Sequence, residues 1–541
     1  MELCGRFSCE FERDRKESQT GMDDVIFAIW LATFAVGAAW YILYLTHMFQ
    51  QNSYKPREYG EWLRVHTNVG RLLGKSLYAV LSLPLVFVGN RGCMIAACLM
   101  NGMTILVNKP RKAKKPLVYT PRVKRLLATP GIVWGLILLI VAFPGIYGYL
   151  WVTMLLLFLL QPVLLLLVNL INHPVERAIN RHYIQDAARI LREMPGLRII
   201  GVTGSYGKTS VKYFLNTLLS AQYNVLCTPG NYNTTLGVVR TIRENMKPFH
   251  EIFICEMGAR EVGDIKEICD LVHPDYGIIT SIGPQHLQSF HTLDNIISTK
   301  FELADAVPDT GKVFLNYDNE YIREHKIEKP VVSYGVGDDA VDFRAYDIRV
   351  SARGSSFRMK DETGEAYEFH TRLVGSHNVQ NIAGAIAVAH TLGIPMEKLL
   401  YPVRQLESVP HRLQLIRQGD RIILDDAYNS NKSGFEAALD TLALFQELRI
   451  LLTPGMVELG EKQYAENKEA GMYAANKCDY AILVGKEQTK PIQDGLLEAG
   501  FPQNRMILVD TLQEAFQMVN AIPDERQKVI LLENDLPDVY A

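Results

Sequence analysis

The chain has 541 residues, which is too long for one domain, so roughly two to four domains are expected. Its formal net charge of −3 at pH 7 argues against a protein whose whole surface binds nucleic acid. The eight cysteines are scattered and form no paired CxxC motif, which argues against a zinc site and against a disulfide framework.

The first third of the sequence holds long apolar runs, and the remainder alternates short apolar runs with charged helical patterns. This contrast predicts an α-helical membrane region followed by an α/β region. Residues 1–22 are polar, so Met22 is a second candidate for the true start, and the sequence does not decide between the two. Val25–Met48 is long and apolar enough to span a bilayer, and it lacks the features of a cleaved signal.

Further apolar stretches follow in the first third. Leu77–Val107 is interrupted at Pro84 and at Asn90-Arg91-Gly92. This favours a hairpin, either re-entrant or a double crossing, over one tilted span or an interfacial or buried helix. Gly131–Tyr149 and Trp151–Ile171 predict a second hairpin. The basic loop at 108–126 belongs in the cytoplasm by the positive-inside rule. We therefore expect a multi-pass membrane protein whose C-terminal domains are cytoplasmic.

A glycine-rich stretch, Gly-Val-Thr-Gly-Ser-Tyr-Gly-Lys-Thr-Ser at 201–210, lies between an apolar strand pattern and a helical pattern. Strand, glycine turn and helix together indicate a phosphate-binding loop, in which backbone N–H groups face phosphate oxygens. Lys208 would supply charge to the β- and γ-phosphates, and the Thr209 hydroxyl a magnesium ligand. The spacing is one residue longer than usual, and the alternative is a chance Gly-Lys-Thr.

Polar side chains follow the next predicted strands, and ligands of open parallel sheets bind beyond the carboxyl ends of strands. Glu256 is therefore a candidate magnesium ligand, and His286 a second metal contact. Asn316 and Asp318 suit a nucleotide base or ribose. The polar loop at 228–237 suits either ligand contact or an ordinary connection.

These motifs occur in the order seen in the Mur ligase family, which residues 197–541 resemble. The shared segments include Thr-Gly-Ser-Tyr-Gly-Lys-Thr, Gly-Asn-Tyr-Asn-Thr-Thr, Glu-Met-Gly-Ala, Gly-Pro-Gln-His-Leu-Gln-Ser-Phe, Thr-Lys-Phe-Glu and Leu-Asn-Tyr-Asp. The resemblance implies a P-loop-type central ATPase domain at 191–407 and a Rossmann-like C-terminal domain at 408–541. Short strands alternating with helical patterns after residue 420 agree with the latter. The helical region at 1–190 replaces the family's usual UDP-binding domain.

The resemblance also assigns roles to residues. ATP phosphates would be held by Gly204, Ser205, Tyr206, Gly207, Lys208, Thr209 and Ser210. Magnesium would be held by Thr209, Glu256 and His286, and the catalytic set would be Lys208, Lys300, His286 and Arg412. Further nucleotide contacts would come from Asn316, Asp318, His377, Asn381, Arg412, Asp426 and Asn429. Substrate contacts would come from Asn231, Asn233, Thr234 and Thr235.

Two of these assignments have structural alternatives. Lys300 matches the family lysine that is carbamylated, which turns a cation into a carboxylate-like metal ligand; the alternative is a solvated helix lysine. His377 and Asn381 lie at the start of a predicted helix, and the alternative there is helix capping by Ser376 or Asn378.

The reaction implied by the resemblance is ATP- and Mg²⁺-dependent amide formation through an acyl phosphate. The partners would be a peptidyl, muramyl-type cell-wall precursor and an amino acid or a D-alanyl-D-alanine-like dipeptide. Membrane lipid and other membrane-bound cell-wall enzymes of a bacterial cell membrane are further expected partners. The alternatives are a membrane-tethered ATP-binding scaffold and a ligase for another envelope peptide. An ATP-driven transporter is a third alternative, against which the sequence shows no second nucleotide-site signature.

Overall fold

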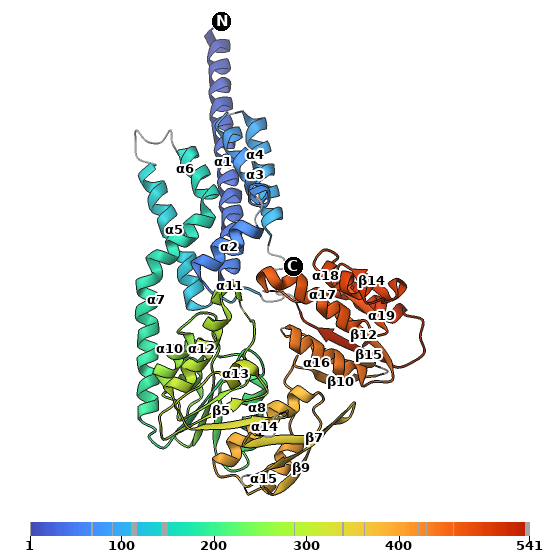
Figure 1. Cartoon of the computed structure of the whole chain (residues 1–541). Helices are drawn as coiled ribbons and strands as arrows, with labels where there is room; N and C mark the ends of the chain where they lie inside the picture. Colours follow the sequence, from blue (N-terminus) through green and yellow to red (C-terminus); the bar gives the residue numbers. More distant parts are fainter. Residues whose placement is uncertain are drawn as a thin grey trace. The chain divides into compact units, whose positions relative to one another are not determined.

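The computed structural model describes residues 2–66, 69–88, 90–109, 116–141, 150–285, 287–337, 340–361, 363–419, 421–428, 430–457 and 459–535. The chain divides into two compact units. The first holds the N-terminal residues to Ile179, and the second is Asn180–Leu536 (Figure 1).

The first unit is helical. Its helices are α1 (Glu2–Gln51), α2 (Pro56–His66), α3 (Val69–Phe87), α4 (Arg91–Asn108), α5 (Pro121–Val141), α6 (Leu150–Leu159) and the first part of α7 (Gln161–Arg192). The break predicted at Asn90 is confirmed, because the Asn90 side chain caps α4 by accepting a bond from the Gly92 N–H at 2.8 Å. A buried polar chain joins three helices: Trp30 donates to Ser82, and Ser82 donates to Asn101.

The predicted localisation, a multi-pass protein of the bacterial cell membrane with cytoplasmic catalytic domains, is wrong. Within the described part of the chain, two helices have the length and composition to cross a bilayer, Asp23–Gln51 and Arg91–Asn108. The run at 151–171 is divided between α6 and α7 just before Pro162, which has no N–H to continue the preceding helix. The turn of the second predicted hairpin, at 142–149, lies outside the described residues.

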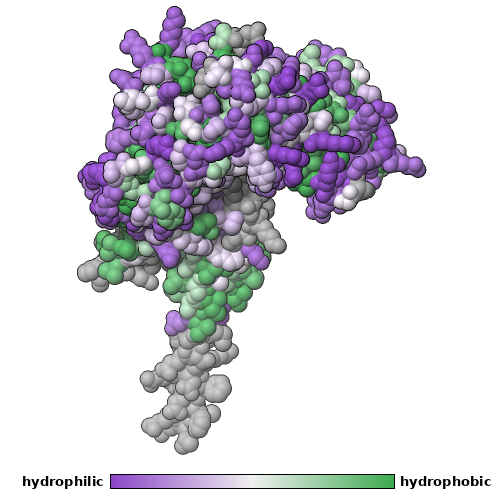
Figure 2. All heavy atoms as spheres, turned by 90° about the horizontal axis from the view of Figure 1, so that it is seen from below, coloured by the Kyte–Doolittle hydropathy of each residue, from purple (hydrophilic) through white to green (hydrophobic). Residues whose placement is uncertain are grey.

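Apolar side chains are exposed on this unit (Figure 2). They include Leu99 and Leu106 of α4, at 69% and 65% exposure, and Ile132 and Leu139 of α5, at 64% and 67%. Most of the visible surface of the second unit is hydrophilic by comparison. Exposed apolar area of this extent marks a surface that contacts another apolar phase or partner.

The second unit begins with a nine-stranded sheet in the order β2-β3-β1-β4-β5-β6-β7-β8-β9. The strands are β1 (Arg198–Thr203), β2 (Val225–Cys227), β3 (Ile252–Glu256), β4 (Tyr276–Ile279), β5 (Lys312–Asn316), β6 (Val331–Gly335), β7 (Phe343–Ser351), β8 (Gly354–Lys360) and β9 (Ala366–Thr371). Pairing from β2 through to β7 is parallel, and β7, β8 and β9 pair antiparallel.

Helices cover this sheet on both faces, as parallel sheets require. Ile200 of β1 packs in one apolar cluster with Phe214 and Ile386, and its neighbour Ile199 packs in another with Ile268. The helices are α8 (Lys208–Leu219), α9 (Thr235–Asn245), α10 (Asp264–Val272), α11 (Leu287–Phe290), α12 (Leu293–Ala306), α13 (Glu320–Glu324), α14 (Ser376–Thr391) and α15 (Met396–Arg404). Alternating side chains of β1 thus secure helices on opposite faces.

A second sheet of six strands follows, in the order β10-β11-β15-β12-β13-β14. The strands are β10 (Gln414–Gln418), β11 (Arg421–Asp426), β12 (Leu448–Thr453), β13 (Tyr480–Val484), β14 (Met506–Val509) and β15 (Lys528–Glu533), and all but β10 pair in parallel. The accompanying helices are α16 (Lys432–Ala443), α17 (Gln463–Ala474), α18 (Lys490–Glu498) and α19 (Leu512–Ala521). A helical region followed by α/β structure is therefore confirmed.

Candidate functional site

The glycine loop lies between β1 and α8, in the middle of the first sheet. Gly207 has φ +81°, and a Cβ at this position would meet Asn381 Oδ1 at 2.7 Å. Gly204 has φ +151°, and a Cβ there would collide with the Thr280 side chain. Glycine is needed at both positions because the backbone conformation and the close neighbours exclude a side chain.

The loop is held by residues that follow the neighbouring strand β4. The N–H of Ser205 donates to Ser281 O at 2.6 Å, and the N–H of Tyr206 donates to Ser281 Oγ at 3.1 Å. Thr280 Oγ1 donates to Tyr206 O at 2.5 Å. Sequence reasoning missed Thr280 and Ser281, because only the sheet order brings β4 beside β1. Because these two N–H groups are engaged, we expect the N–H groups at the start of α8, which lack partners within the helix, to face a bound phosphate.

Lys208 begins α8, and its side chain turns back over the glycine loop. Nζ donates to Gly204 O at 2.6 Å and to Ser205 O at 3.1 Å. Burial lowers the pKa of Lys208 to about 8; the charge of Glu256 opposes this shift, and that of Arg412 adds to it. A bound phosphate would be a stronger partner for this ammonium than two carbonyl oxygens, because the phosphate is negatively charged.

Glu256, the last residue of β3, lies beside the loop and is almost completely buried. Its Oε1 accepts bonds from Thr209 Oγ1 and from Asn233 Nδ2, both at 3.1 Å. Its Oε2 lies 2.9 Å from Nζ of Lys212, which is 0% exposed. Burial opposes ionisation, but Lys212 and Lys208 outweigh it and lower the pKa of the Glu256 carboxyl, so it is ionised.

The pair of Thr209 and Glu256 fits a magnesium ion. Mg²⁺ holds oxygen ligands at about 2.1 Å in an octahedron, so neighbouring ligands lie about 3 Å apart. Thr209 Oγ1 and Glu256 Oε1 are 3.1 Å apart. No group of three His, Cys, Asp or Glu side chains gathers among the described residues, but Mg²⁺ usually takes its other ligands from water and phosphate. His286, the second predicted contact, lies outside those residues.

Lys300, on α12, is 2% exposed. The alternative of a solvated helix lysine is therefore wrong. Burial, with a contribution from nearby Lys208, lowers its pKa well below the usual value. Within the described part of the chain, Lys300 Nζ forms no ion pair. A neutral buried amine is the form that reacts with carbon dioxide, so these surroundings favour carbamylation, which stays a prediction.

Asn316 and Asp318 are engaged within the fold. Asn316 Nδ2 donates to Thr280 O at 2.7 Å. The Asp318 carboxylate accepts bonds from the N–H groups of Val336 and Gly337, both at 2.8 Å, and from Gln380 at 2.6 Å. These bonds tie β5 to its neighbours and favour a structural role, so nucleotide contact by either residue stays a prediction.

His377 and Asn381 begin α14. Asn381 lies against Gly207 of the glycine loop. Burial lowers the pKa of His377 to about 4, so its ring is neutral at physiological pH. The capping alternative is wrong: α14 has no side-chain cap, and Asn378 instead donates to Val374 O at 2.8 Å.

The loop after β2 separates the four predicted substrate residues. Asn233 reaches Glu256, and Asn231 Nδ2 donates to the Tyr428 hydroxyl at 3.4 Å. Thr234 instead caps α9. Thr235 Oγ1 donates to Glu267 at 2.9 Å. Only the first two thus lie toward the site, and the threonines hold a helix.

Arg412 is the predicted residue at the start of the second sheet. Its guanidinium lies 4.1 Å above the Tyr428 ring. The residues on either side, His411 and Leu413, have φ +60° and +46°, so the backbone is strained here. The N–H of Leu413 donates to Asp426 Oδ1 at 3.0 Å. This bond places Arg412 beside the carboxyl end of β11.

Carboxyl groups gather at that end of the second sheet. Asp426 is paired in register with Glu533 of β15. Burial raises the pKa of Asp426 to about 6, with Arg412 opposing. Glu533, which sequence reasoning missed, is 1% exposed and accepts a bond from Ser430 Oγ at 2.5 Å. Asn429 lies outside the described residues.

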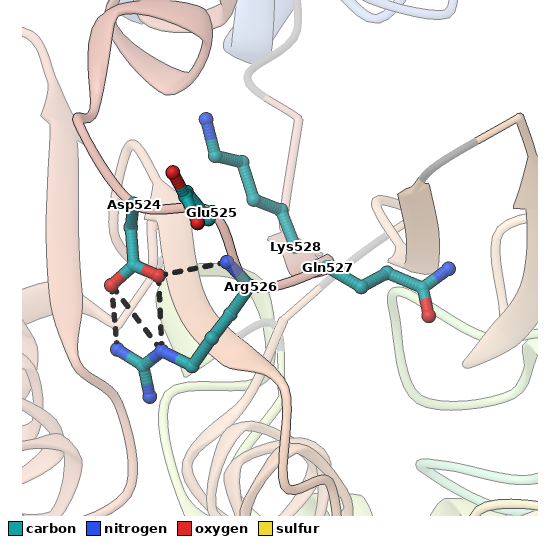
Figure 3. A pocket seen from close by; sticks show the side chains of 5 residues that line it. All are labelled: Asp524, Glu525, Arg526, Gln527 and Lys528. Carbon is teal, nitrogen blue, oxygen red and sulfur yellow. Dashed lines mark hydrogen bonds and ion pairs between the residues drawn. The ribbon is translucent and has the colours of Figure 1, made fainter.

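A pocket elsewhere in the second unit is lined by the consecutive residues Asp524–Lys528, which lead into the start of β15 (Figure 3). Arg526 and Asp524 form an ion pair at 2.8 Å across this turn. Asp524 and Arg526 thus neutralise one another within the turn, and none of the predicted site residues lines this pocket.

Two family models match the second unit. Residues 202–389 match the Mur ligase middle domain, and residues 411–532 match the Mur ligase, glutamate ligase domain. With the geometry of the glycine loop, Glu256 and Lys300, these matches define an ATP-dependent ligase that forms carbon–nitrogen bonds. The chain belongs to the Mur ligase family, and both matches lie C-terminal to the helical unit.

The relatives narrow the comparison. The UDP-N-acetylmuramoyl-tripeptide–D-alanyl-D-alanine ligases of Escherichia coli (strain K12) and Bacillus subtilis (strain 168) are each 30% identical over 56% of this chain, covering 67% and 66% of their own lengths. The crystal structure of MurF from Acinetobacter baumannii has a TM-score of 0.60 at 25% identity, covering 66% of this chain and 77% of its own. MurF from Thermotoga maritima in complex with ADP shares the fold, with a TM-score of 0.59 at 24% identity over 66% and 80%.

Proposed function

We propose that this chain uses ATP and Mg²⁺ to join D-alanyl-D-alanine, or a closely related amine, to a muramyl-tripeptide cell-wall precursor. The observation that carries the proposal is the contact of Thr209 with Glu256 beside the glycine loop and Lys208. It occurs in a chain related to ligases named for that substrate and amine. Residues 191–407 act in this proposal as a P-loop ATPase domain, and 408–541 as a Rossmann-like domain.

The reaction proceeds through an acyl phosphate. A substrate carboxylate attacks the γ-phosphorus of ATP and releases ADP, and the amine then displaces phosphate to form the amide. Lys208 would exchange its two carbonyl partners for the phosphates. Thr209 and Glu256 would hold magnesium, which would offset phosphate charge. Arg412 approaches the same charge from the second sheet. In this proposal His286 is a further metal contact. The remaining nucleotide contacts are Asn316, Asp318, His377, Asn381, Asp426 and Asn429.

Fewer contacts support the proposed substrate residues than support the proposed phosphate residues. Asn231 and Asn233 are the residues of the 228–235 loop that support a substrate contact. In the sequence resemblance, segments 453–460 and 531–538 replace the family segments that help to seat the amine. Another amino acid or dipeptide therefore belongs among the amines to be tested.

Contact of the helical unit with membrane lipid, or with a membrane-bound cell-wall enzyme, is a finer part of the proposal. The exposed Leu99, Leu106, Ile132 and Leu139 support an apolar partner for this unit. A carboxylate acceptor linked to lipid would be delivered at such a surface. Retention of the full chain on vesicles of phosphatidylglycerol and phosphatidylethanolamine tests the lipid contact. If the chain is not retained even at low salt, the lipid contact is rejected.

The deciding experiment measures ADP release by the full chain. Muramyl tripeptides linked to UDP and to lipid are each combined with D-alanyl-D-alanine, single D- and L-amino acids, or no amine. We expect release that requires both an acceptor and an amine, and none from Lys208→Ala. Absence of acceptor-dependent release across the whole panel would reject the ligase proposal.

A further inference from the structure

A lysine outside the predicted set contacts Glu256, a candidate metal ligand. Lys212 lies one helical turn after Thr209 on α8, and its side chain is 0% exposed. Nζ is 2.9 Å from Glu256 Oε2 and donates to Gly230 O at 2.6 Å. It also lies 4.5 Å from the centroid of the Tyr213 ring. The ammonium is therefore bound from three directions.

The two oxygens of Glu256 consequently have different partners. Oε2 faces Lys212, whereas Oε1 faces Thr209 and Asn233. A carboxylate free to rotate could offer a metal either oxygen or both. Lys212 removes that freedom, because rotation would break a buried ion pair. Mg²⁺ demands near-ideal octahedral geometry, so a carboxylate locked with one oxygen beside Thr209 is suited to it.

Charge gives Lys212 a second effect. The buried pair of Lys212 and Glu256 has no net charge, so a free divalent cation that approaches Oε1 is attracted by the carboxylate and repelled by the ammonium. Nucleotide phosphates add the negative charge that this pair lacks. Removal of the lysine charge would leave Glu256 a stronger ligand for a free cation.

We propose that Lys212 is a positioning residue that directs one oxygen of Glu256 to the metal and makes divalent-cation binding depend on bound nucleotide. This inference rests on the proposed function in one respect, that Thr209 and Glu256 hold Mg²⁺ beside the phosphates. It does not depend on which acceptor or amine is joined. A purely structural ion pair would stabilise the fold without changing the nucleotide dependence.

The test measures Mn²⁺ binding to the full chain by electron paramagnetic resonance of free Mn²⁺, with and without ADP. Lys212→Gln keeps a hydrogen-bond donor without the charge, Lys212→Met removes both, and Lys212→Arg keeps the charge. For wild type and Lys212→Arg we expect weak binding without ADP and strong binding with it. For the neutral variants we expect nucleotide-free binding to tighten about tenfold or more, from loss of a nearby charge.

The double variant Lys212→Met/Glu256→Gln is the matched control, and its nucleotide-free gain should disappear. An unchanged ratio of affinities with and without ADP in a folded neutral variant would overturn the inference. So would failure of both neutral variants to fold while the double variant folds, since the pair would then serve the fold alone. Absent ADP release with the expected Mn²⁺ results would reject the ligase proposal and leave this inference standing.

Discussion

The titration of Lys208 makes the sharpest prediction for the phosphate side of the site. Its pKa in the nucleotide-free protein is lowered to about 8 by burial. Bound phosphates favour the charged form, so ADP binding raises this pKa. The ADP affinity should therefore be full below pH 8 and fall as pH rises above it. Between pH 7 and pH 9 the fraction of charged Lys208 drops about tenfold, and the dissociation constant for ADP should rise by about the same factor.

Calorimetric titration of ADP at saturating Mg²⁺ measures this slope directly. Lys208→Arg is the matched control, because a guanidinium stays charged across the range and its affinity should be flat with pH. Lys208→Met should bind weakly with no slope. A flat profile for wild type, or the same slope in Lys208→Arg, would refute the assignment of the titration to Lys208.

Three further predictions concern the loop, the buried lysine and the substrate side. Gly207→Ala should lose ADP binding and about 1–3 kcal/mol of unfolding free energy, because it adds a close contact to a left-handed backbone. Gly263→Ala is the control, because Gly263 has φ +93° and open space around it, and this variant should keep ADP binding. Calorimetry and thermal melts compare the two variants. Lys300→Ala should abolish acceptor-dependent ADP release with ADP affinity within a few-fold of wild type, and ¹³C-bicarbonate should give a carbamate NMR signal that this variant lacks. Asn233→Ala should lower turnover at least tenfold, whereas Thr235→Val should leave it nearly unchanged; equal losses would contradict the separation of the loop.

Local features were accessible from the sequence. The strand before Gly201, the glycine turn and the helix beginning at Lys208 follow from short-range patterning, and the break at Asn90 from a capping residue and a glycine. The region after residue 420 likewise shows its strands and helices in short apolar periods. Each of these depends on residues that are neighbours along the chain, which is why a single sequence suffices.

Hydropathy over the first third of the sequence did not predict the number of long apolar helices correctly. Length and apolar content suggested several crossings, but the run at 151–171 is broken before Pro162, and two of the described helices meet the criteria for a span. An apolar stretch indicates a preference for burial, and helices can satisfy it by packing together, as Trp30, Leu83 and Phe158 do in one apolar cluster. The surroundings of such a stretch are a property of the folded unit.

By itself the sequence determined the family and the glycine turn between strand and helix, because each is written in adjacent residues or in a fixed order of motifs. Only the tertiary structure decided that Ser281 secures the loop, that Thr234 and Thr235 hold a helix, and that Lys212 is paired with Glu256. Except for the local cap by Thr234, these contacts join segments far apart in the chain that the folded sheet brings together. A lysine on a helix has no sequence mark of burial, and its partner is set by the strand that lies beside it.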